Sequence, residues 1–285
     1  MHWAKVSPTI YWGRVQETFS PRCMGVSEAV LVTRPAGQAG RLCEELAAAG
    51  YRPVHQPLLA VSPVRPLDAA QRRFVETLDS YAHCLFVSAN AARFGLDCVL
   101  DQWPEWPGSA QCYAVGDSTA AVLRAAGLPV LTPGENMTSE GLLALPSLQT
   151  VSGQRVLIIK GEGGRAALRQ VLEERGARVD ELRCYRRSAP DVSPHALQEL
   201  LRQEGIRSIL ISSGEALENL TALLESVADT SVSSHVCTLV VPSSRVAEQA
   251  RVAGWRDVVA AANASDNAML AALQQTTGRR GKTVD

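Results

Sequence analysis

From Val30 onward, short runs of β-branched and apolar residues alternate with apolar-periodic segments of helical length. This alternation is typical of parallel α/β architecture, in which strands and helices follow one another along the chain. Glycine also follows several helical segments at the position where a left-handed C-cap is needed, namely at Gly50, Gly127, Gly176 and Gly254. The pattern therefore predicts an α/β fold.

The same pattern gives approximate boundaries for the individual elements. The predicted strands are Ala29–Thr33, Arg52–Pro57, Cys84–Val87, Gln111–Val115, Arg155–Ile159, Arg178–Tyr185, Ser208–Ile211, Cys237–Val241 and Asp257–Ala260. The predicted helices include Gln38–Ala49, Ser118–Ala126, Arg165–Arg175, Ser193–Glu204 and Arg245–Ala253.

The chain also contains a weak internal repeat. The segment Cys84–Ala91 resembles Ser208–Ala216, and Tyr113–Thr119 corresponds to Val240–Arg245. In each copy a buried strand runs into a small polar turn that opens a helix. This geometry aims backbone N–H groups and a helix N-terminus at the carboxyl edge of a parallel sheet. Two such units predict two similar lobes.

Composition argues against several classes of function. The 28 basic and 29 acidic residues give a formal charge of -1, so no general electrostatic case exists for a nucleic-acid or membrane-surface protein. No run approaches the ~18 apolar residues of a membrane span. The seven cysteines are scattered without a Cys-x-x-Cys pair, which favours the reducing cytoplasm over a disulfide framework or a zinc knuckle. The histidines lack metal-ligand spacing, and neither a Gly-x-Ser-x-Gly elbow nor a P-loop occurs, so the sequence predicts neither a metal site nor a Ser/His/Asp enzyme.

A glycine-rich run at residues 160–165 follows a predicted strand and precedes a helix. Its glycines permit close backbone approach, so an anion can sit on the helix N-terminus. The spacing departs from the dinucleotide fingerprint, because the last glycine comes one position early, and a plain βα turn explains the run about as well. Lys160 is the only lysine outside the two ends of the chain. Since no carbonyl-chemistry motif surrounds it, we interpret it as an unpaired surface lysine rather than a Schiff-base lysine.

Basic residues are concentrated between Arg155 and Arg187, where nine stand against five acidic residues. Such an excess suits an acidic ligand such as a polycarboxylate, because guanidinium groups can bind a carboxylate through two parallel hydrogen bonds. The alternative is a solvated helix face on which Arg169 pairs with Glu173. Small hydroxyl residues stand at nearly every predicted strand end, where they either cap the next helix or ring a cleft that holds carboxylates. They are Thr33, Ser88, Ser118, Thr119, Thr138, Ser139, Ser212, Ser213, Ser243 and Ser244.

The two ends of the chain lack folding signals. Residues 1–27 show neither helical nor strand periodicity, so we expect either a disordered N-terminal extension or a segment upstream of a true start at Met24. Residues 277–285 are predicted to form a polar C-terminal tail.

Several short stretches together are similar to one known family. In chain order they are Val30–Pro35, Phe86–Asn90, Ala114–Ala120, Ser139–Leu143, Gly161–Arg165, Gly176–Ala177 and Cys184–Arg187. Their order and spacing resemble those of uroporphyrinogen-III synthases over about residues 29–275. The resemblance implies a cofactor-free cytoplasmic enzyme of haem biosynthesis. It would dehydrate and cyclise the octacarboxylate linear tetrapyrrole hydroxymethylbilane, inverting ring D, to give uroporphyrinogen III.

The family resemblance also implies an architecture. Two Rossmann- or flavodoxin-like α/β lobes are joined by a two-stranded connector, with the active site between them. We expect residues 28–63 plus 189–276 to form the first lobe and residues 66–186 the second. The segments Leu59–Pro66 and Arg183–Pro190 mix extended residues with prolines, which independently favours crossings there. The expected protein is monomeric, binds no nucleic acid or membrane, and contacts the preceding pathway enzyme transiently.

Tyr185 is, by resemblance, the group that hydrogen-bonds or protonates the leaving hydroxyl. Ser88, Thr119 and Ser213 match cleft positions that bind carboxylates. The second repeat departs from the family, since Pro242-Ser243-Ser244 stands where many relatives carry Gly-x-Thr-Thr, and Ser244 is the substitute we predict. The predicted substrate-binding residues are Thr33, Arg34, Ser88, Asn90, Gly116, Thr119, Ser139, Lys160, Gly163, Arg165, Ser212, Ser213 and Ser244.

Two other classes of function remain open on the sequence. One is a non-enzymatic two-lobed binding protein that closes on a small polyanion. The other is a nucleotide-dependent enzyme that uses the glycine turn at residues 161–164.

Overall fold

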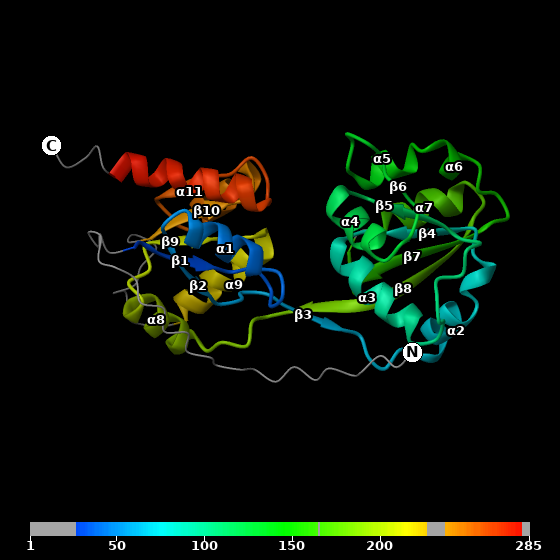
Figure 1. Cartoon of the computed structure of the whole chain (residues 1–285), viewed down its shortest axis with the longest axis horizontal. Helices are drawn as coiled ribbons and strands as arrows, with labels where there is room; N and C mark the ends of the chain where they lie inside the picture. The colour runs from blue at the N-terminus through cyan, green and yellow to red at the C-terminus, as the bar shows by residue number, and fades with distance from the viewer. Residues whose placement is uncertain (1–26, 165, 227–236, 281–285) are drawn as a thin grey trace.

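The structure is a computed structural model that describes residues 27–164, 166–226 and 237–280, with side chains described as far as Thr276. Two separate β-sheets, each with helices packed against it, form two lobes (Figure 1). The predicted N-terminal extension up to residue 26 lies outside the described residues. So do Arg165 and residues 281–285 of the predicted C-terminal tail.

The first lobe combines the beginning and the end of the described chain. Its five-stranded sheet has the order β11-β10-β9-β1-β2, and all neighbouring strands are parallel. The strands are β1 (Ala29–Val32), β2 (Arg52–His55), β9 (Ser208–Leu210), β10 (Thr238–Val241) and β11 (Val258–Ala260). The helices are α1 (Gly40–Ala48), α8 (Pro194–Gln203), α9 (Gly214–Glu225), α10 (Ser244–Val252) and α11 (Asp266–Arg280).

Both faces of this sheet are buried. Val30 and Val32 of β1 pack in a cluster with residues of α1 and α11, whereas Leu31 packs with residues of α8, α9 and α10. Successive strand residues point to opposite faces, so a strand covered on both sides must be apolar throughout. Burial of each such side chain stabilises the fold by about 1.5–3 kcal/mol. This is why β1 reads as a continuous apolar run.

The second lobe is continuous in sequence. Its six-stranded sheet has the order β3-β8-β7-β4-β5-β6, in which only the β3–β8 pair is antiparallel. The strands are β3 (Ala60–Pro63), β4 (His83–Phe86), β5 (Gln111–Ala114), β6 (Val130–Leu131), β7 (Arg155–Gly161) and β8 (Arg178–Ser188). The helices are α2 (Ala69–Glu76), α3 (Ala89–Leu100), α4 (Asp117–Ala125), α5 (Ser139–Leu143), α6 (Pro146–Gln149) and α7 (Ala167–Glu174), with a 3₁₀ turn η1 at Leu78–Ser80.

The helices of the second lobe divide between the faces of its sheet. One buried cluster joins the sheet to α2, α3 and α4, and another joins it to α5, α6 and α7. Helix α3 lies close to the sheet at Gly95, where an added Cβ would stand 2.5 Å from Cγ2 of Ile159. Real Cβ atoms essentially never come so close, so glycine is the residue that this packing admits.

Strands β3 and β8 form the connection between the lobes (Figure 1). Strand β8 pairs with β7 along most of its length, and its last residues, from Tyr185 to Ser188, pair with β3. The sequence predicted an end of this strand at Tyr185, but β3 supplies hydrogen-bond partners beyond the rest of the sheet. Residues 60–63, assigned from sequence to the first lobe, therefore belong to the sheet of the second lobe.

The predicted fold class is confirmed by the two parallel-dominated sheets. The predicted helix ends are confirmed as well, since Gly50, Gly127, Gly176 and Gly254 have φ angles between 80° and 88°. A short strand at Val130–Leu131 was not predicted. None of the helices in the described residues has both the length and the apolar run needed to cross a lipid bilayer.

Candidate functional site

An open cleft of about 600 Å³ lies between the two lobes. Many of its lining residues come just after a parallel strand, in the turns that follow β1, β4, β5, β9 and β11. Ligands of open α/β sheets bind outside the carboxyl ends of the strands, which is the position of this cleft. The cleft is lined by Arg34, Pro35, Gln38, Arg41, Leu59, Val61, Ser88, Ala89, Asn90, Arg93, Ser118, Tyr185, Arg187, Ser212, Ser213, Ala264, Ser265, Asp266 and Asn267.

Two serines face the cleft from equivalent positions in the two lobes. Ser88 is the N-cap of α3, and its Oγ accepts the Ala91 N–H at 3.0 Å. Ser213 is the N-cap of α9, and its Oγ accepts the Ala216 N–H at 3.1 Å. Each serine satisfies a backbone donor that the helix leaves unpaired, and each lies at the positive end of a helix dipole. Both positions favour a negatively charged group in the cleft.

Tyr185 supplies a second hydroxyl beside Ser88. Its phenol oxygen lies 3.1 Å from the Ser88 Oγ, within hydrogen-bond distance, and either oxygen can be the donor. The side chain is 6% exposed, and its ring stacks on Phe94 with the centroids 5.8 Å apart. The ring is therefore held by packing, and Tyr185 lines the cleft next to Ser88.

A second cavity of about 320 Å³ adjoins the cleft, because Ser88, Tyr185 and Arg187 line both. The glycine-rich run forms part of its wall, and Gly163 and Gly164 adopt φ angles of 74° and 84°. These angles lie in the left-handed region that glycine tolerates. The hydroxyl pair of Tyr185 and Ser88 thus stands at the junction of the two hollows.

The second cavity contains a buried ion pair. Lys160 Nζ lies 3.1 Å from Oε1 of Glu181, and the two side chains are only 11% and 10% exposed. Arg183 approaches the other carboxylate oxygen of Glu181 at 3.6 Å. The interpretation of Lys160 as an unpaired surface lysine was wrong, because the register of β7 on β8 places Glu181 beside it inside the lobe. A buried charge of this kind requires such a partner.

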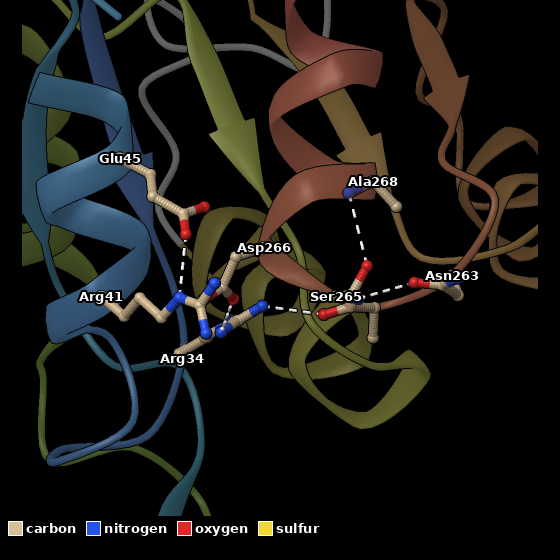
Figure 2. A network of polar contacts seen from close by, with 8 residues as sticks. Arg34, Arg41, Glu45, Asn263, Ser265, Asp266 and Ala268 are labelled. Atoms are coloured by element: carbon tan, nitrogen blue, oxygen red, sulfur yellow. Dashed lines mark hydrogen bonds and ion pairs between the residues drawn. The ribbon is translucent and has the colours of Figure 1, made fainter. Parts of the chain in front are cut away.

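The wall contributed by the first lobe is a network of charged groups (Figure 2). The guanidinium of Arg34 pairs with Asp266 at the start of α11 and donates from Nη2 to the Ala264 carbonyl at 2.7 Å. Arg41 donates to Glu45 at 2.8 Å and lies 3.7 Å from Asp266. The hydrogen bond to Glu45, with the charges of Glu45 and Asp266, raises the pKa of the Arg41 guanidinium above its ordinary value.

Two contacts between side chains connect the lobes across the cleft. Gln38 of the first lobe donates to Asn90 of the second at 3.0 Å. Arg187, near the end of β8, lies 3.2 Å from Glu215 in the first turn of α9. Both contacts use polar groups that line the cleft or border it, so a ligand between the lobes competes with them for hydrogen bonds.

The predicted site residues are distributed over three kinds of position. The cleft is lined by Tyr185, Arg34, Ser88, Asn90, Ser212 and Ser213. The second cavity is lined by Ser139, Lys160 and Gly163, again with Ser88 and Tyr185. Neither cavity is lined by Thr33, Gly116, Thr119 or Ser244.

Thr33 and Thr119 are buried instead of facing the cleft. Thr33 is fully buried, and its hydroxyl donates to the Leu210 carbonyl at 2.7 Å. Thr119 is 3% exposed and lies on the buried side of α4, whereas the preceding residue, Ser118, lines the cleft. These threonines are corrected to core residues, and Ser118 replaces Thr119 at the cleft.

Gly116 and Ser244 also lie outside the two cavities. Gly116 is the N-cap of α4, and a Cβ added to it would lie in ordinary contact with Met137, 3.7 Å from its Cβ. Ser244 is the exposed first residue of α10, and the capping hydroxyl belongs to Ser243, which accepts the Val246 N–H at 3.4 Å. The predicted substitution of Ser244 for a family threonine therefore has no contact with the cleft here.

Sequence reasoning missed several residues that line the two cavities. Those in the cleft include Gln38, Arg41, Arg93 and Asp266, and Glu181 lines the second cavity. Arg187 and Gly161 lie in the basic region and the glycine-rich run that the sequence predicts to suit an anion, but neither was predicted as an individual site residue. Four arginines and one aspartate thus line the cleft, which favours an acidic ligand. Arg93 lies in the first turns of α3 after Ser88, so a search extended by one helical turn beyond each strand end finds it.

The described residues offer little else for chemistry. They contain no group of three or more His, Cys, Asp or Glu side chains that could hold a metal ion. Cys184 precedes Tyr185, but its thiol donates to the Lys160 carbonyl at 3.4 Å, and burial raises its pKa far above the ordinary value. It therefore stays protonated and packs inside the lobe rather than acting as a nucleophile.

Fold and site define a two-lobed α/β protein with an arginine-lined cleft and a hydroxyl pair between its lobes. The family model "Uroporphyrinogen-III synthase HemD" matches residues 40–271. The chain is 34% identical over 250 residues to the uroporphyrinogen-III synthase of Escherichia coli (strain K12), covering 86% of this chain and all of that protein. It is 32% identical over 252 residues to that of Salmonella typhimurium, with the same coverage. The chain belongs to the uroporphyrinogen-III synthase family.

Solved structures support the fold. A mutant uroporphyrinogen III synthase from the extremely thermophilic bacterium Thermus thermophilus has a TM-score of 0.56 at 20% identity, with 89% of this chain and 100% of that chain covered. The enzyme from Helicobacter pylori 26695 has a TM-score of 0.55 at 16% identity, with 88% and 99% covered. At these identities the likeness concerns the architecture alone.

Proposed function

We propose that this protein is a uroporphyrinogen-III synthase, a cyclising lyase of haem biosynthesis that takes hydroxymethylbilane. The reaction removes water from the linear tetrapyrrole, inverts ring D and closes the macrocycle. Membership of the family supports the activity. The observation that carries the site is the hydroxyl pair of Tyr185 and Ser88, which stands at the junction of the cleft and the second cavity.

The first step needs a proton donor and little else. The carbon–oxygen bond of the hydroxymethyl group breaks as the pyrrole nitrogen supplies its electron pair, and loss of the pyrrole N–H proton to water then gives a neutral azafulvene. Tyr185 donates a hydrogen bond, or its proton, to the departing hydroxide so that it leaves as water. The Ser88 hydroxyl can then donate a hydrogen bond to the Tyr185 oxygen, since the Ser88 Oγ already accepts a hydrogen bond from a backbone N–H. That second bond stabilises negative charge on the phenol as it develops.

The second step is a choice between two carbons of ring D. Closure at the free position gives the type I isomer, whereas attack by the substituted carbon leads to inversion and the type III isomer. Positioning decides between them, because both carbons belong to the same tethered ring. The cleft offers Arg34, Arg41, Arg93 and Arg187 for the substrate carboxylates. Held at several carboxylates, the ring presents one face to the azafulvene.

Further parts of the proposal concern the surroundings of the reaction. We infer a monomer that works without a cofactor in the cytoplasm, binds no nucleic acid or membrane, and contacts the preceding pathway enzyme only transiently. All six described cysteines are free, which supports a reducing compartment. We infer the lobe boundaries predicted from the sequence, residues 28–63 plus 189–276 and residues 66–186, with one change: residues 60–63 belong to the second sheet.

The decisive experiment is an assay that resolves product isomers. Hydroxymethylbilane is supplied to the purified protein, the products are oxidised, and type I and type III uroporphyrins are separated by chromatography. We expect type III in excess with the protein and type I alone with heat-denatured protein. Type I alone with folded protein would overturn the proposal. Tight binding of uroporphyrinogen III without turnover, seen as a raised melting temperature, would favour a polyanion-binding protein instead.

A further inference from the structure

We propose that Gly161 is a positioning residue. Because it has no side chain, the Tyr185 phenol can pack directly against the backbone at residue 161, and this packing fixes the position of the phenol hydroxyl. The inference depends on the proposed function, because it concerns the hydroxyl that acts on the substrate. It assigns a specific role to the first glycine of the glycine-rich run. For that run the sequence predicts an anion-binding or plain βα turn, with Lys160, Gly163 and Arg165 as substrate-binding residues, and it predicts no role for Gly161 itself.

The contact between Gly161 and Tyr185 leaves no space for a side chain. A Cβ built on Gly161 would stand 2.6 Å from Cζ of Tyr185, 2.8 Å from Cε2 and 3.0 Å from Cε1. Carbon atoms pack at about 3.5–4.0 Å, so even a methyl group overlaps the ring. The overlap falls on the end of the ring that carries the hydroxyl. A side chain at residue 161 would therefore push on the functional end of the phenol.

Backbone conformation does not explain this glycine. Gly163 and Gly164 have φ angles of 74° and 84°, which disfavour other residues, but Gly161 has no positive φ angle. It lies at the end of β7 in ordinary extended conformation, which any residue can adopt. The requirement at Gly161 is for space, whereas at Gly163 and Gly164 it is for backbone freedom.

A β-bulge places Gly161 under the phenol. In the pairing of β7 with β8, Lys160 lies opposite Arg183, and the next pair is Gly161 with Tyr185. Cys184 is skipped, so the register shifts by one residue at this point. Bulges re-aim side chains next to active sites. Here the shift brings a residue without a side chain opposite the phenol of the cleft.

The ring cannot relieve crowding by moving as a whole. Phe94 stacks on it, and the ring is almost fully buried. The backbone of Tyr185 is held by its carbonyl, which accepts the Glu162 N–H at 2.8 Å, and by the pairing of Tyr185 with Pro63. An added methyl must therefore displace the outer end of the ring, which moves the hydroxyl away from Ser88. Misplacement of a reacting group by about 1 Å can reduce a rate ~100-fold.

The test is a double-mutant cycle in kcat for type III formation, measured on the full chain. Gly161→Ala is expected to lower kcat about tenfold or more with KM changed by less than about threefold, the same pattern as is expected of Tyr185→Phe. Once the hydroxyl is gone it cannot be misplaced. The variant with both changes is therefore expected to have the kcat of Tyr185→Phe alone, within about twofold.

Gly95→Ala is the matched control for steric overlap, because it introduces a comparable overlap with Ile159 in the same lobe and Gly95 lines neither cavity. We expect it to lower the melting temperature but to keep kcat. A crystal structure of Gly161→Ala adds a readout that needs no activity, and there the distance between the Tyr185 and Ser88 oxygens is expected to exceed 3.5 Å. If Gly161→Ala does not fold, adding Tyr185→Leu removes the ring tip and is expected to restore folding.

Three results obtained with folded variants would overturn the inference. They are wild-type kcat in folded Gly161→Ala, a further tenfold loss when Gly161→Ala is added to Tyr185→Phe, and an unchanged hydroxyl distance in the crystal. A failure to fold that Tyr185→Leu does not repair counts equally against it. If the wild-type protein forms no type III isomer, the proposed function fails, while the crystallographic distance still decides whether Gly161 seats the phenol.

Discussion

Both lobes form their side of the cleft from the same local structure, a strand followed by a serine that caps a helix. The side chains placed around this structure differ between the lobes. Strand β4 is followed by Ser88, the N-cap of α3, and strand β9 is followed by Ser213, the N-cap of α9. The φ and ψ angles of the two serines are -163° and 163° in one lobe and -162° and 164° in the other. In the second lobe Tyr185 places another hydroxyl against the serine. Among the described residues Ser213 has no such counterpart.

The difference arises from the strand that connects the lobes. Strand β8 continues past its parallel partner to pair with β3, and this continuation carries Tyr185 to the Ser88 turn. The first lobe has parallel strands alone, and its cleft wall holds the ion pairs of Arg34 and Arg41 with Asp266. The repeated unit thus supplies the geometry of both sides. The second lobe adds the hydroxyl pair of Tyr185 and Ser88, and the first lobe adds the ion-pair network around Asp266.

The largest effect is expected from removal of the Tyr185 hydroxyl. Tyr185→Phe keeps the ring and its contact with Phe94, so the free energy of unfolding should change by less than ~1 kcal/mol. Loss of the proton donor should lower kcat for type III formation by roughly tenfold or more, because acid catalysis typically contributes ~100-fold or above. Isomer-resolved kinetics and chemical denaturation measure the two quantities.

Tyr113→Phe is the control for that variant. Tyr113 is a fully buried tyrosine of the same lobe, and its hydroxyl bonds to Ser147 and His83 at 2.9 Å, outside both cavities. It should cost about 1–2 kcal/mol of stability through lost hydrogen bonds while kcat stays unchanged. If Tyr185→Phe turns over at the wild-type rate, the Tyr185 hydroxyl is not catalytic, and the second lobe contributes no catalytic group that the first lobe lacks.

A smaller loss, in stability rather than in rate, is expected from the first lobe. Asp266→Asn removes the carboxylate that Arg34 and Arg41 share, and the Arg34–Asp266 side chains are only 17% and 16% exposed. The free energy of unfolding should fall by about 1–3 kcal/mol, between the values for exposed and buried pairs. We expect kcat to fall by less than in Tyr185→Phe, because the hydroxyl pair is intact.

The exposed pair of Arg65 with Asp101 in the second lobe provides the comparison, with side chains 42% and 55% exposed. Asp101→Asn should change the free energy of unfolding by less than ~1 kcal/mol. Both free energies of unfolding are measured by urea denaturation. If Asp266→Asn and Asp101→Asn lower the free energy of unfolding equally, the burial of the Arg34–Asp266 pair does not make it more stabilising than an exposed pair.

A still smaller pair of effects concerns the two serine caps themselves. Ser88→Ala and Ser213→Ala should each lower the free energy of unfolding by about 1 kcal/mol, since each removes an N-cap of the same geometry. In kinetics they should differ. Ser88→Ala also removes the partner of Tyr185 and should lower kcat several-fold, whereas Ser213→Ala should change it about twofold or less. Equal kinetic losses would mean that both serines only bind carboxylates.

How far these features follow from the sequence depends on whether they are local. Buried strands, serine caps and glycine helix ends are properties of a few neighbouring residues, and the sequence predicted them. Amphipathic spacing also holds enough information to separate Ser118 from Thr119, because Thr119 shares the buried face of α4 with Ala120 and Leu123. The prediction of Thr119 as a cleft residue relied on resemblance and did not apply this test.

Pairings between distant residues were beyond the sequence. Ser88 and Tyr185 are 97 positions apart, and their contact depends on the length of β8 and on its bulge. The pair of Lys160 with Glu181 depends on the same register, so composition alone left Lys160 without a partner. A register shift of one residue turns a strand side chain to the other face of the sheet. The register shift between β7 and β8 leaves no local pattern in the sequence from which it could be predicted.

The smallest effect is expected where the lobes touch. Arg187 and Glu215 form an ion pair between them at 3.2 Å, with side chains 45% and 39% exposed. Exposed pairs contribute about 0–1 kcal/mol, so Glu215→Gln should leave the melting temperature nearly unchanged. Each lobe has its own buried core, so removal of an exposed ion pair between the lobes should not lower the stability of either core.

The same variant should act on substrate binding, because Arg187 lines both cavities and shares its charge with Glu215. Without that carboxylate the guanidinium is free for a carboxylate of the substrate, and KM should fall about two- to threefold. The gain should be largest at low ionic strength, since screening weakens attraction between exposed charges. Steady-state kinetics at two salt concentrations measure it. A raised KM, or a melting temperature lowered by several degrees, would show instead that the bridge holds the two lobes in their working arrangement.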